Sequence, residues 1–353
     1  MGTIETLGKW NLETSTWIKS VKNEDRGRSS AIGTYEDIIT TPNEPIHYIL
    51  IALGSRVEDH SRDFFNIKET EISVNKFISY FSNKNKNVAI RTFLMDADAP
   101  IREDAKIISQ YIDNLSKQDQ IASINLLGVS KCGTMSFYVP KYFERLSSFT
   151  KTNIFTIASP WDGTKMASPK IFYPEVKRLI KSKFGNTKLA DTIYNGLISI
   201  YEGVSSNSHM DYDIAIQNGV PKEKEHVYDE TFIKNIFNDD NKSAIQRINS
   251  YHNLITGIDE KTIKEAILTG NVTGIGLCIL HELFFEEQSD GLVKTSSQHL
   301  VEEHIPKEKI KTHHLYSTHH SVIGTDRALN DIMFVVNDTI DEQVDKAKVL
   351  QKH

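Results

Sequence analysis

The hydrophobic pattern of the first half of the chain alternates between two periods. Continuous apolar runs, typical of strands that are buried on both faces, occur at residues 46–53, 88–94, 124–128 and 153–158. Apolar side chains at helical spacing lie between these runs, at residues 72–81 and 105–115. The alternation predicts βαβ units and therefore an α/β fold class, with a doubly wound, mostly parallel sheet.

The alternation stops after Thr164, and the pattern becomes helical and irregular up to residue 246. Apolar helical faces occur at residues 176–184 and 189–201, the second containing Leu189 and Leu197. We predict that residues 165–246 form a helical lid or cap insertion over the carboxyl edge of the sheet and line an apolar pocket. Helices that simply flank the sheet fit this pattern equally well.

Strand character returns after the insertion, so the core is expected to comprise residues 1–164 and 247–353. Strands are predicted at residues 250–256 and 309–316, and helices at 263–268 and 331–348. The apolar stretch 275–285 fits a helix, with a strand as the alternative. Residues 1–45 are irregular, with short strands expected at 4–7 and 35–40.

Composition narrows the class of protein. The net charge of −6 provides no overall basic field, so nucleic acid is not an expected partner. Two cysteines give no readable disulfide framework, and no apolar run approaches the length of a transmembrane segment. The start of the sequence lacks the features of a secretory signal peptide. We expect a cytoplasmic protein, or one exported without a classical signal peptide.

Ser130 follows the strand at 124–128 and precedes a helical pattern. A serine hydroxyl on a sharp strand-to-helix turn is raised out of the sheet, where a base can remove its proton. The G-x-S-x-G pattern is met at Gly128 and Ser130, but Cys132 stands at its fifth position and Gly133 follows. An ordinary turn that contains a serine is the alternative interpretation. Pro140 is expected to kink the helix after Ser130.

A nucleophilic serine needs a base, and the base needs an acid that orients it. In doubly wound hydrolases these residues follow in the order serine, acid, histidine, and Ser130, Asp290 and His319 provide that order. His320 is the alternative base because it is adjacent to His319, and Asp162 is the alternative acid. His313 and His314 are expected to face opposite sides of a strand.

Four short motifs in this order resemble the α/β-hydrolase family, and within it the bacterial lipases and esterases. They are the turn at Ser130, the segment 156–164, the acid loop 289–293 and the histidine loop 318–324. The resemblance implies that the backbone N–H groups of Ser55 and Lys131 form the oxyanion hole. It implies no calcium site, because Ser321 stands where calcium-binding relatives have an aspartate. No cofactor and no metal site are expected.

The expected activity is hydrolysis of a carboxylic ester of a lipid or another hydrophobic acyl substrate, with a membrane surface as one setting for it. A phospholipase or deacylase that acts as a bacterial effector is an alternative. A catalytically inactive α/β-hydrolase-fold binding protein is another, because the turn at Ser130 is altered and the family's His-Gly pair is Leu53-Gly54 here.

Overall fold

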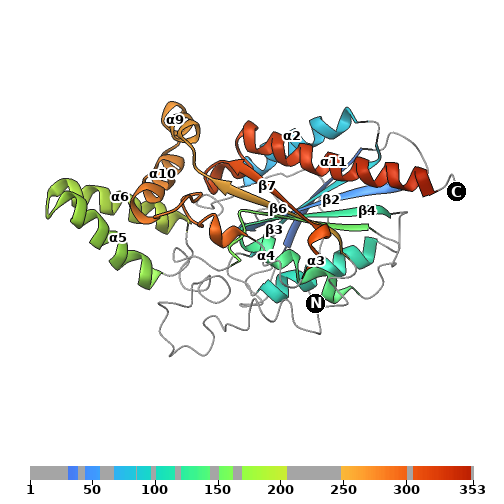
Figure 1. Ribbon diagram of the computed structural model, residues 1–353, viewed down its shortest axis with the longest axis horizontal. Helices are drawn as coiled ribbons and strands as arrows, with labels where there is room; N and C mark the ends of the chain where they lie inside the picture. The colour runs from blue at the N-terminus through green and yellow to red at the C-terminus, as the bar shows by residue number, and fades with distance from the viewer. Residues whose placement is uncertain are drawn as a thin grey trace.

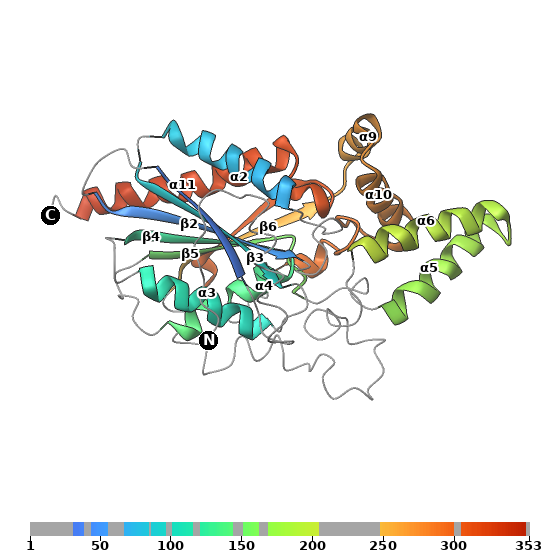
Figure 2. The ribbon, with the colours of Figure 1, turned by 180° about the vertical axis from the view of Figure 1, so that it is seen from behind.

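The computed structural model describes residues 31–38, 44–55, 67–84, 86–96, 101–115, 121–143, 151–161, 169–204, 248–299 and 305–350. Within these ranges a central sheet is covered by helices on both faces, and helical hairpins extend from one end of it (Figures 1 and 2). The expected strand at residues 4–7 and the alternative acid Asp162 lie outside the described residues.

Seven strands form the sheet, in the order β1-β3-β2-β4-β5-β6-β7. Their bounds are β1 Ala31–Ile38, β2 Ile46–Ser55, β3 Val88–Asp96, β4 Ile121–Val129, β5 Lys151–Ile157, β6 Ile248–Gly257 and β7 Ile310–Tyr316. Only β1 runs antiparallel, where it pairs with β3 at the edge, and the other described pairs are parallel. The carboxyl ends of β2 to β7 therefore meet at one edge of the sheet.

Each face of the sheet has its own core because alternate side chains of a strand point to opposite faces. Along β2, Leu50 belongs to the core beneath α3 (Ile101–Leu115) and α4 (Lys131–Ser136), whereas Ile49 and Ile51 belong to the other core. That second core lies beneath α2 (Ile67–Ser82) and α11 (Asp326–Leu350).

The predicted α/β fold class is confirmed, and each apolar run coincides with a strand. The stretch expected at 275–285 is helical up to residue 284 rather than extended, since α10 spans Val272–Phe284. The expected kink at Pro140 is wrong: α4 has already ended at Ser136, and Pro140 lies in the first turn of a 3-10 helix, Val139–Tyr142. Proline fits a first turn because the missing N–H would have no helical partner there.

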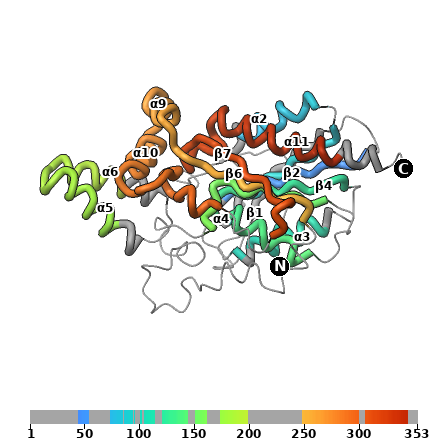
Figure 3. The backbone as a smooth tube through the Cα atoms, viewed as in Figure 1, coloured from blue at the N-terminus to red at the C-terminus, as the bar shows by residue number. Residues whose placement is uncertain are grey.

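Two helices of the predicted insertion, α5 (Pro169–Phe184) and α6 (Lys188–Val204), form a hairpin that extends beyond the carboxyl edge of the sheet (Figure 3). The hairpin packs against α10, where Val176 and Leu197 meet Leu277 in a small separate core. Leu189, expected to line the pocket, is instead 58% exposed, because it lies at the end of the hairpin beyond the reach of α10.

The core beneath α11 is apolar near the carboxyl edge but polar near the amino edge. There Asn153 on β5 donates a hydrogen bond to Asn125 on β4 (2.8 Å), and its side-chain oxygen accepts one from Ser250 on β6 (2.8 Å). His252, also on β6, lies 3.2 Å from His313 of β7 and 3.0 Å from the Ser250 hydroxyl. As expected, His313 is half-buried and His314 is exposed. Continuous hydrogen bonding lets these polar side chains remain buried.

This polar layer predicts a pH-dependent stability. Burial lowers the pKa of His252 to about 3, whereas an unfolded histidine titrates near its ordinary value of 6.5. Between these values the unfolded chain binds a proton that the folded chain does not, so stability falls as the pH falls. The free energy of unfolding should lose about 1.4 kcal/mol per pH unit from this residue between pH ~6 and ~4.

Chemical denaturation over this pH range measures the effect, with two variants for comparison. His252→Gln should flatten the pH dependence, although His47, whose pKa burial lowers to about 4, adds a part that remains. His314→Gln is the matched control, because it removes a histidine from the exposed side of β7. An unchanged slope in His252→Gln would contradict the assignment.

Candidate functional site

Ser130 lies on a tight turn between β4 and α4. Its backbone has φ 56° and ψ −128°, a region that residues with a side chain rarely adopt. The turn is fixed by a hydrogen bond from Ser130 N–H to the Ile157 carbonyl (2.8 Å) and by another from Gly133 N–H to the Ser130 carbonyl (2.9 Å). Ser130 is partly exposed, whereas the residues on either side of it are buried. The turn therefore presents this side chain at the carboxyl edge.

Two glycines allow the close packing around this turn. A Cβ atom on Gly128 would lie 2.2 Å from the Cys132 carbonyl oxygen, and one on Gly133 would lie 1.7 Å from the Ser159 hydroxyl oxygen. Both distances are far below van der Waals contact. Cys132, at the position where the common pattern has glycine, is fully buried. The second small residue that this turn needs therefore stands one position later, at Gly133.

Asp290 lies in the loop after α10 and is completely buried, so its carboxylate depends on hydrogen bonds within the protein. One oxygen accepts the backbone N–H groups of Leu292 (3.0 Å) and Val293 (2.8 Å). The other accepts the Thr256 hydroxyl (2.7 Å) and lies 2.7 Å from Nδ1 of His319. Gly291, at φ +93°, allows the turn that brings these amides to the carboxylate.

His319 lies in the loop after β7, and only 3% of it is exposed. Its backbone N–H also donates to the Asp290 carbonyl (2.9 Å), so two contacts hold the acid loop and the histidine loop together. The structure thus brings Asp290 and His319 together, as the order of the motifs predicted. Within the described ranges no hydrogen bond joins His319 to Ser130, and such bonds are often long before substrate is bound.

Thr256 and Gln298 support this pair, and the sequence interpretation missed both roles. The buried Gln298 amide accepts the Thr256 N–H (2.7 Å) and donates to the carbonyls of Thr256 (3.0 Å) and Val293 (3.2 Å). It also donates to the Asp290 carboxylate at 3.4 Å. Gln298 follows Ser296 and Ser297 in a polar stretch of the sequence, and nothing in the spacing of that stretch indicated which of its residues would contact Asp290.

The remaining expected site residues lie on separate elements. Ser55 is the last residue of β2, and Lys131 is the first residue of α4. The Lys131 side chain is buried, with its Nζ 3.3 Å from an oxygen of Asp104. His320 is only partly buried, and it begins the short 3-10 helix His320–Val322. A role for Lys131 in binding an oxyanion would thus belong to its backbone N–H.

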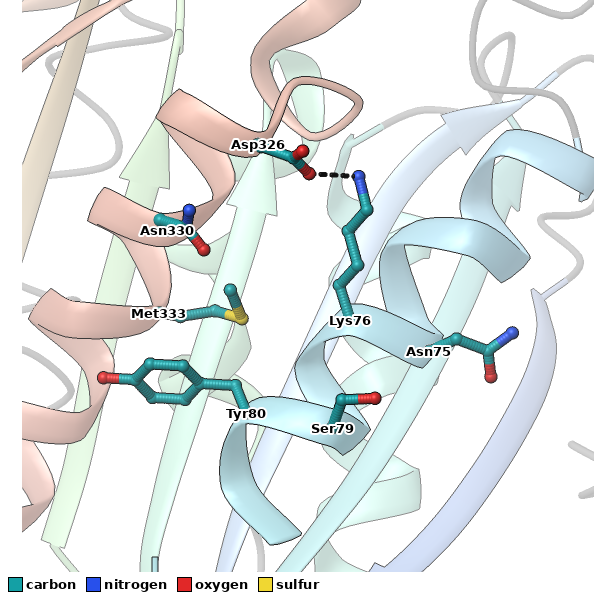
Figure 4. Close-up of a pocket in the computed structure, with 7 residues that line it drawn as sticks. All are labelled: Asn75, Lys76, Ser79, Tyr80, Asp326, Asn330 and Met333. Carbon is teal, nitrogen blue, oxygen red and sulfur yellow. Dashed lines mark ion pairs between the residues drawn. The ribbon is translucent and has the colours of Figure 1, made fainter. Parts of the chain in front are cut away.

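A polar groove lies on the outer side of the molecule, between α2 and α11 (Figure 4). Its volume is about 650 Å³, and its rim carries an ion pair between Lys76 and Asp326 with 2.6 Å between Nζ and Oδ1. The groove does not contain Ser130. The helix α2, which forms one side of the groove, also contacts the histidine loop, because the Ser73 hydroxyl donates to the Ile323 carbonyl (2.6 Å).

The described ranges hold no group of three or more histidine, cysteine, aspartate or glutamate side chains arranged to bind a metal ion. Ser321 accepts a hydrogen bond from the Thr318 hydroxyl (2.8 Å). None of the helices that the structure describes combines the length and the apolar character that crossing a bilayer requires.

No protein-family model matches the sequence, and no curated protein matches it. Among solved structures, the chain is similar to Est1E from Butyrivibrio proteoclasticus, with 12% identity, a TM-score of 0.39, and coverage of 89% of this chain and 94% of that one. It is also similar to a lipase-esterase related protein from Clostridium acetobutylicum, with 12% identity, a TM-score of 0.40, and coverage of 86% and 98%.

The class of the protein follows from its own architecture. A mostly parallel sheet carries an antiparallel edge strand, and a serine stands on a strained turn at the carboxyl end of a central strand. The loop that contains Asp290 comes after β6 and the helices that follow it. The loop that contains His319 comes after β7, the last strand. This arrangement is the α/β-hydrolase fold.

The packing of the turn predicts that Gly133→Ala is strongly destabilising. The added methyl group would overlap the Ser159 side chain and press on the Gly128 carbonyl oxygen, 2.9 Å away. We expect a loss on the order of 3 kcal/mol or more in the free energy of unfolding, measured by urea denaturation.

Gly196→Ala is the matched control, because Gly196 lies within α6 and a Cβ atom there meets nothing within 4 Å. It should be neutral or stabilising by up to about 1 kcal/mol, since alanine favours helix more than glycine does. Equal stabilities of the two variants would show that the turn accommodates a side chain at position 133.

Proposed function

We propose that this protein is a serine hydrolase that cleaves a carboxylic ester with a hydrophobic acyl group. The observation that carries the proposal is the buried hydrogen bond of 2.7 Å between Asp290 and His319, at the same edge of the sheet as Ser130. A buried carboxylate that accepts the Nδ1 hydrogen of a histidine leaves Nε2 as the basic nitrogen. That is the tautomer a general base requires.

The reaction would begin when Ser130 Oγ attacks the ester carbonyl while His319 Nε2 removes the hydroxyl proton. The negative charge that develops on the carbonyl oxygen would be stabilised by the backbone N–H groups of Ser55 and Lys131. His319 would then protonate the departing alcohol and leave an acyl group on Ser130. A water molecule, deprotonated by the same histidine, would hydrolyse this acyl-enzyme and restore the serine.

Asp290 would act by orienting and stabilising the imidazolium that forms during each proton transfer. Its four hydrogen bonds to Thr256, Leu292, Val293 and His319 hold the carboxylate in place without contact with water. We propose the insertion at residues 165–246 as a cap that contributes apolar contacts to the acyl group. The apolar interface of α5 and α6 with α10 supports this role, because it fixes the hairpin beside the carboxyl edge.

Ser130→Ala should abolish hydrolysis of p-nitrophenyl acyl esters and labelling by a fluorophosphonate probe. Loss of the nucleophile from a triad commonly lowers kcat by a factor on the order of 10⁴ or more. Ser130→Gly should be equally inactive but more stable than Ser130→Ala by about 1 kcal/mol or more, because glycine relieves the strain at φ 56°. Turnover or labelling at the wild-type level in both variants would exclude Ser130 as the nucleophile.

The two adjacent histidines provide a second test. His319→Ala should lower kcat by a factor on the order of 10³ or more, because the base is lost. His320→Leu should be much milder, since His320 is only partly buried and lies outside the contact with Asp290. Steady-state kinetics of both variants, with their thermal unfolding as a control, decide the point. The reverse result would assign the base to His320, and two active variants would favour an inactive binding protein.

A further inference from the structure

The end of the α5–α6 hairpin is an exposed turn between two helices. Residues 181–189 are all exposed, and they include the large apolar side chains of Phe184 (37%) and Leu189 (58%). Lys181, Lys183 and Lys188 surround these two residues, with no acidic residue in the same stretch. A run of lysines around exposed apolar side chains is characteristic of surfaces that enter the interface of a lipid bilayer.

The charge of this hairpin is opposite to that of the protein as a whole. Residues 175–191 contain five lysine or arginine residues and two acidic residues, whereas the whole chain has a net charge of −6. Arg178 lies near Glu175, with 3.8 Å between Nη2 and Oε1. Within the described ranges no ion pair includes Lys181, Lys183 or Lys188. Their positive charge is therefore available to an anionic surface.

A second exposed turn with apolar side chains lies at the same end of the molecule. The turn between α9 (Glu260–Thr269) and α10 exposes Ile267 (60%), Leu268 (84%) and Val272 (69%). Both hairpins extend beyond the carboxyl ends of the strands (Figures 1 and 2). Because α10 packs against α5 and α6 through the core that contains Leu197 and Leu277, the two hairpins form one unit.

We propose that the ends of these two hairpins form a docking surface for an anionic lipid bilayer. Lysine ammonium groups would lie at the lipid phosphates, while Phe184, Leu189 and Leu268 would enter the apolar boundary below the headgroups. Each end offers two or three apolar side chains on a projecting turn. That is too little for the area of a stable protein interface but sufficient for shallow insertion. The inference goes beyond the proposed function, because binding to a bilayer requires no chemistry at Ser130.

Co-sedimentation with vesicles tests the proposal. The full chain should bind vesicles of phosphatidylcholine mixed with phosphatidylglycerol much more strongly than vesicles of phosphatidylcholine alone, and added salt should weaken the binding. Replacing Lys181, Lys183 and Lys188 together by glutamine should weaken binding roughly a hundredfold, or about fivefold for each lysine. The matched control replaces Lys261 and Lys264 of α9, each within 3.9 Å of a glutamate oxygen, and should change binding little.

The apolar part is tested by a separate pair of variants. Leu268→Ser should weaken binding to the mixed vesicles roughly tenfold, whereas Phe334→Ser, at a 63% exposed residue of α11, should have no effect. Ser130→Ala should bind like the wild type, so loss of hydrolysis and loss of docking are distinguishable. Absence of binding to mixed vesicles, or equal binding by the triple lysine variant, would overturn the proposal in favour of a soluble acidic partner or none.

Discussion

The completely buried carboxylate of Asp290 constrains the architecture of the candidate site. A charge in that position is tolerated only when hydrogen bonds replace the water it has lost, so the chain must bring donors to both of its oxygens. Thr256 supplies one from β6, the acid loop supplies two backbone amides, and His319 approaches from the loop after β7. The same carboxylate therefore determines the conformation of its own loop and fixes the histidine.

The face of the sheet beneath α11 has an apolar part and a polar part, and both support this arrangement. Near the carboxyl edge the face is apolar, with residues such as Leu254 and Ile157 beneath the helix, so the loops above it rest on a close-packed layer. Near the amino edge the same face carries the Asn153 and His252 hydrogen bonds. Buried polar networks fix the register of the elements that they join, because a slip of one residue would leave donors and acceptors unsatisfied.

The strands and most helices were predictable because buried parallel strands and amphipathic helices leave strong periodic signals. The pairing of Asp290 with His319 was predictable from the order of short motifs. The supporting role of Gln298 was not, since its contacts with Thr256 and Val293 arise only when distant segments fold together. Likewise, the pattern around Ser130 could not show that Gly133, rather than position 132, lies against Ser159.

Backbone strain connects the turn at Ser130 with its neighbour. Ser130 and Ala158 are the two described non-glycine residues at positive φ, and they stand at the carboxyl ends of the adjacent strands β4 and β5. Ser130 donates its N–H to Ile157, and Ala158 donates its own to Leu254 on β6 (3.1 Å). Such conformations cost about 1–3 kcal/mol each and persist only where the surrounding packing enforces them. The conformational free energy of both strained residues is therefore stored at the carboxyl edge of the sheet, where Asp290 and His319 also lie. This is the distribution expected when packing elsewhere in the sheet stabilises strained backbone at one edge.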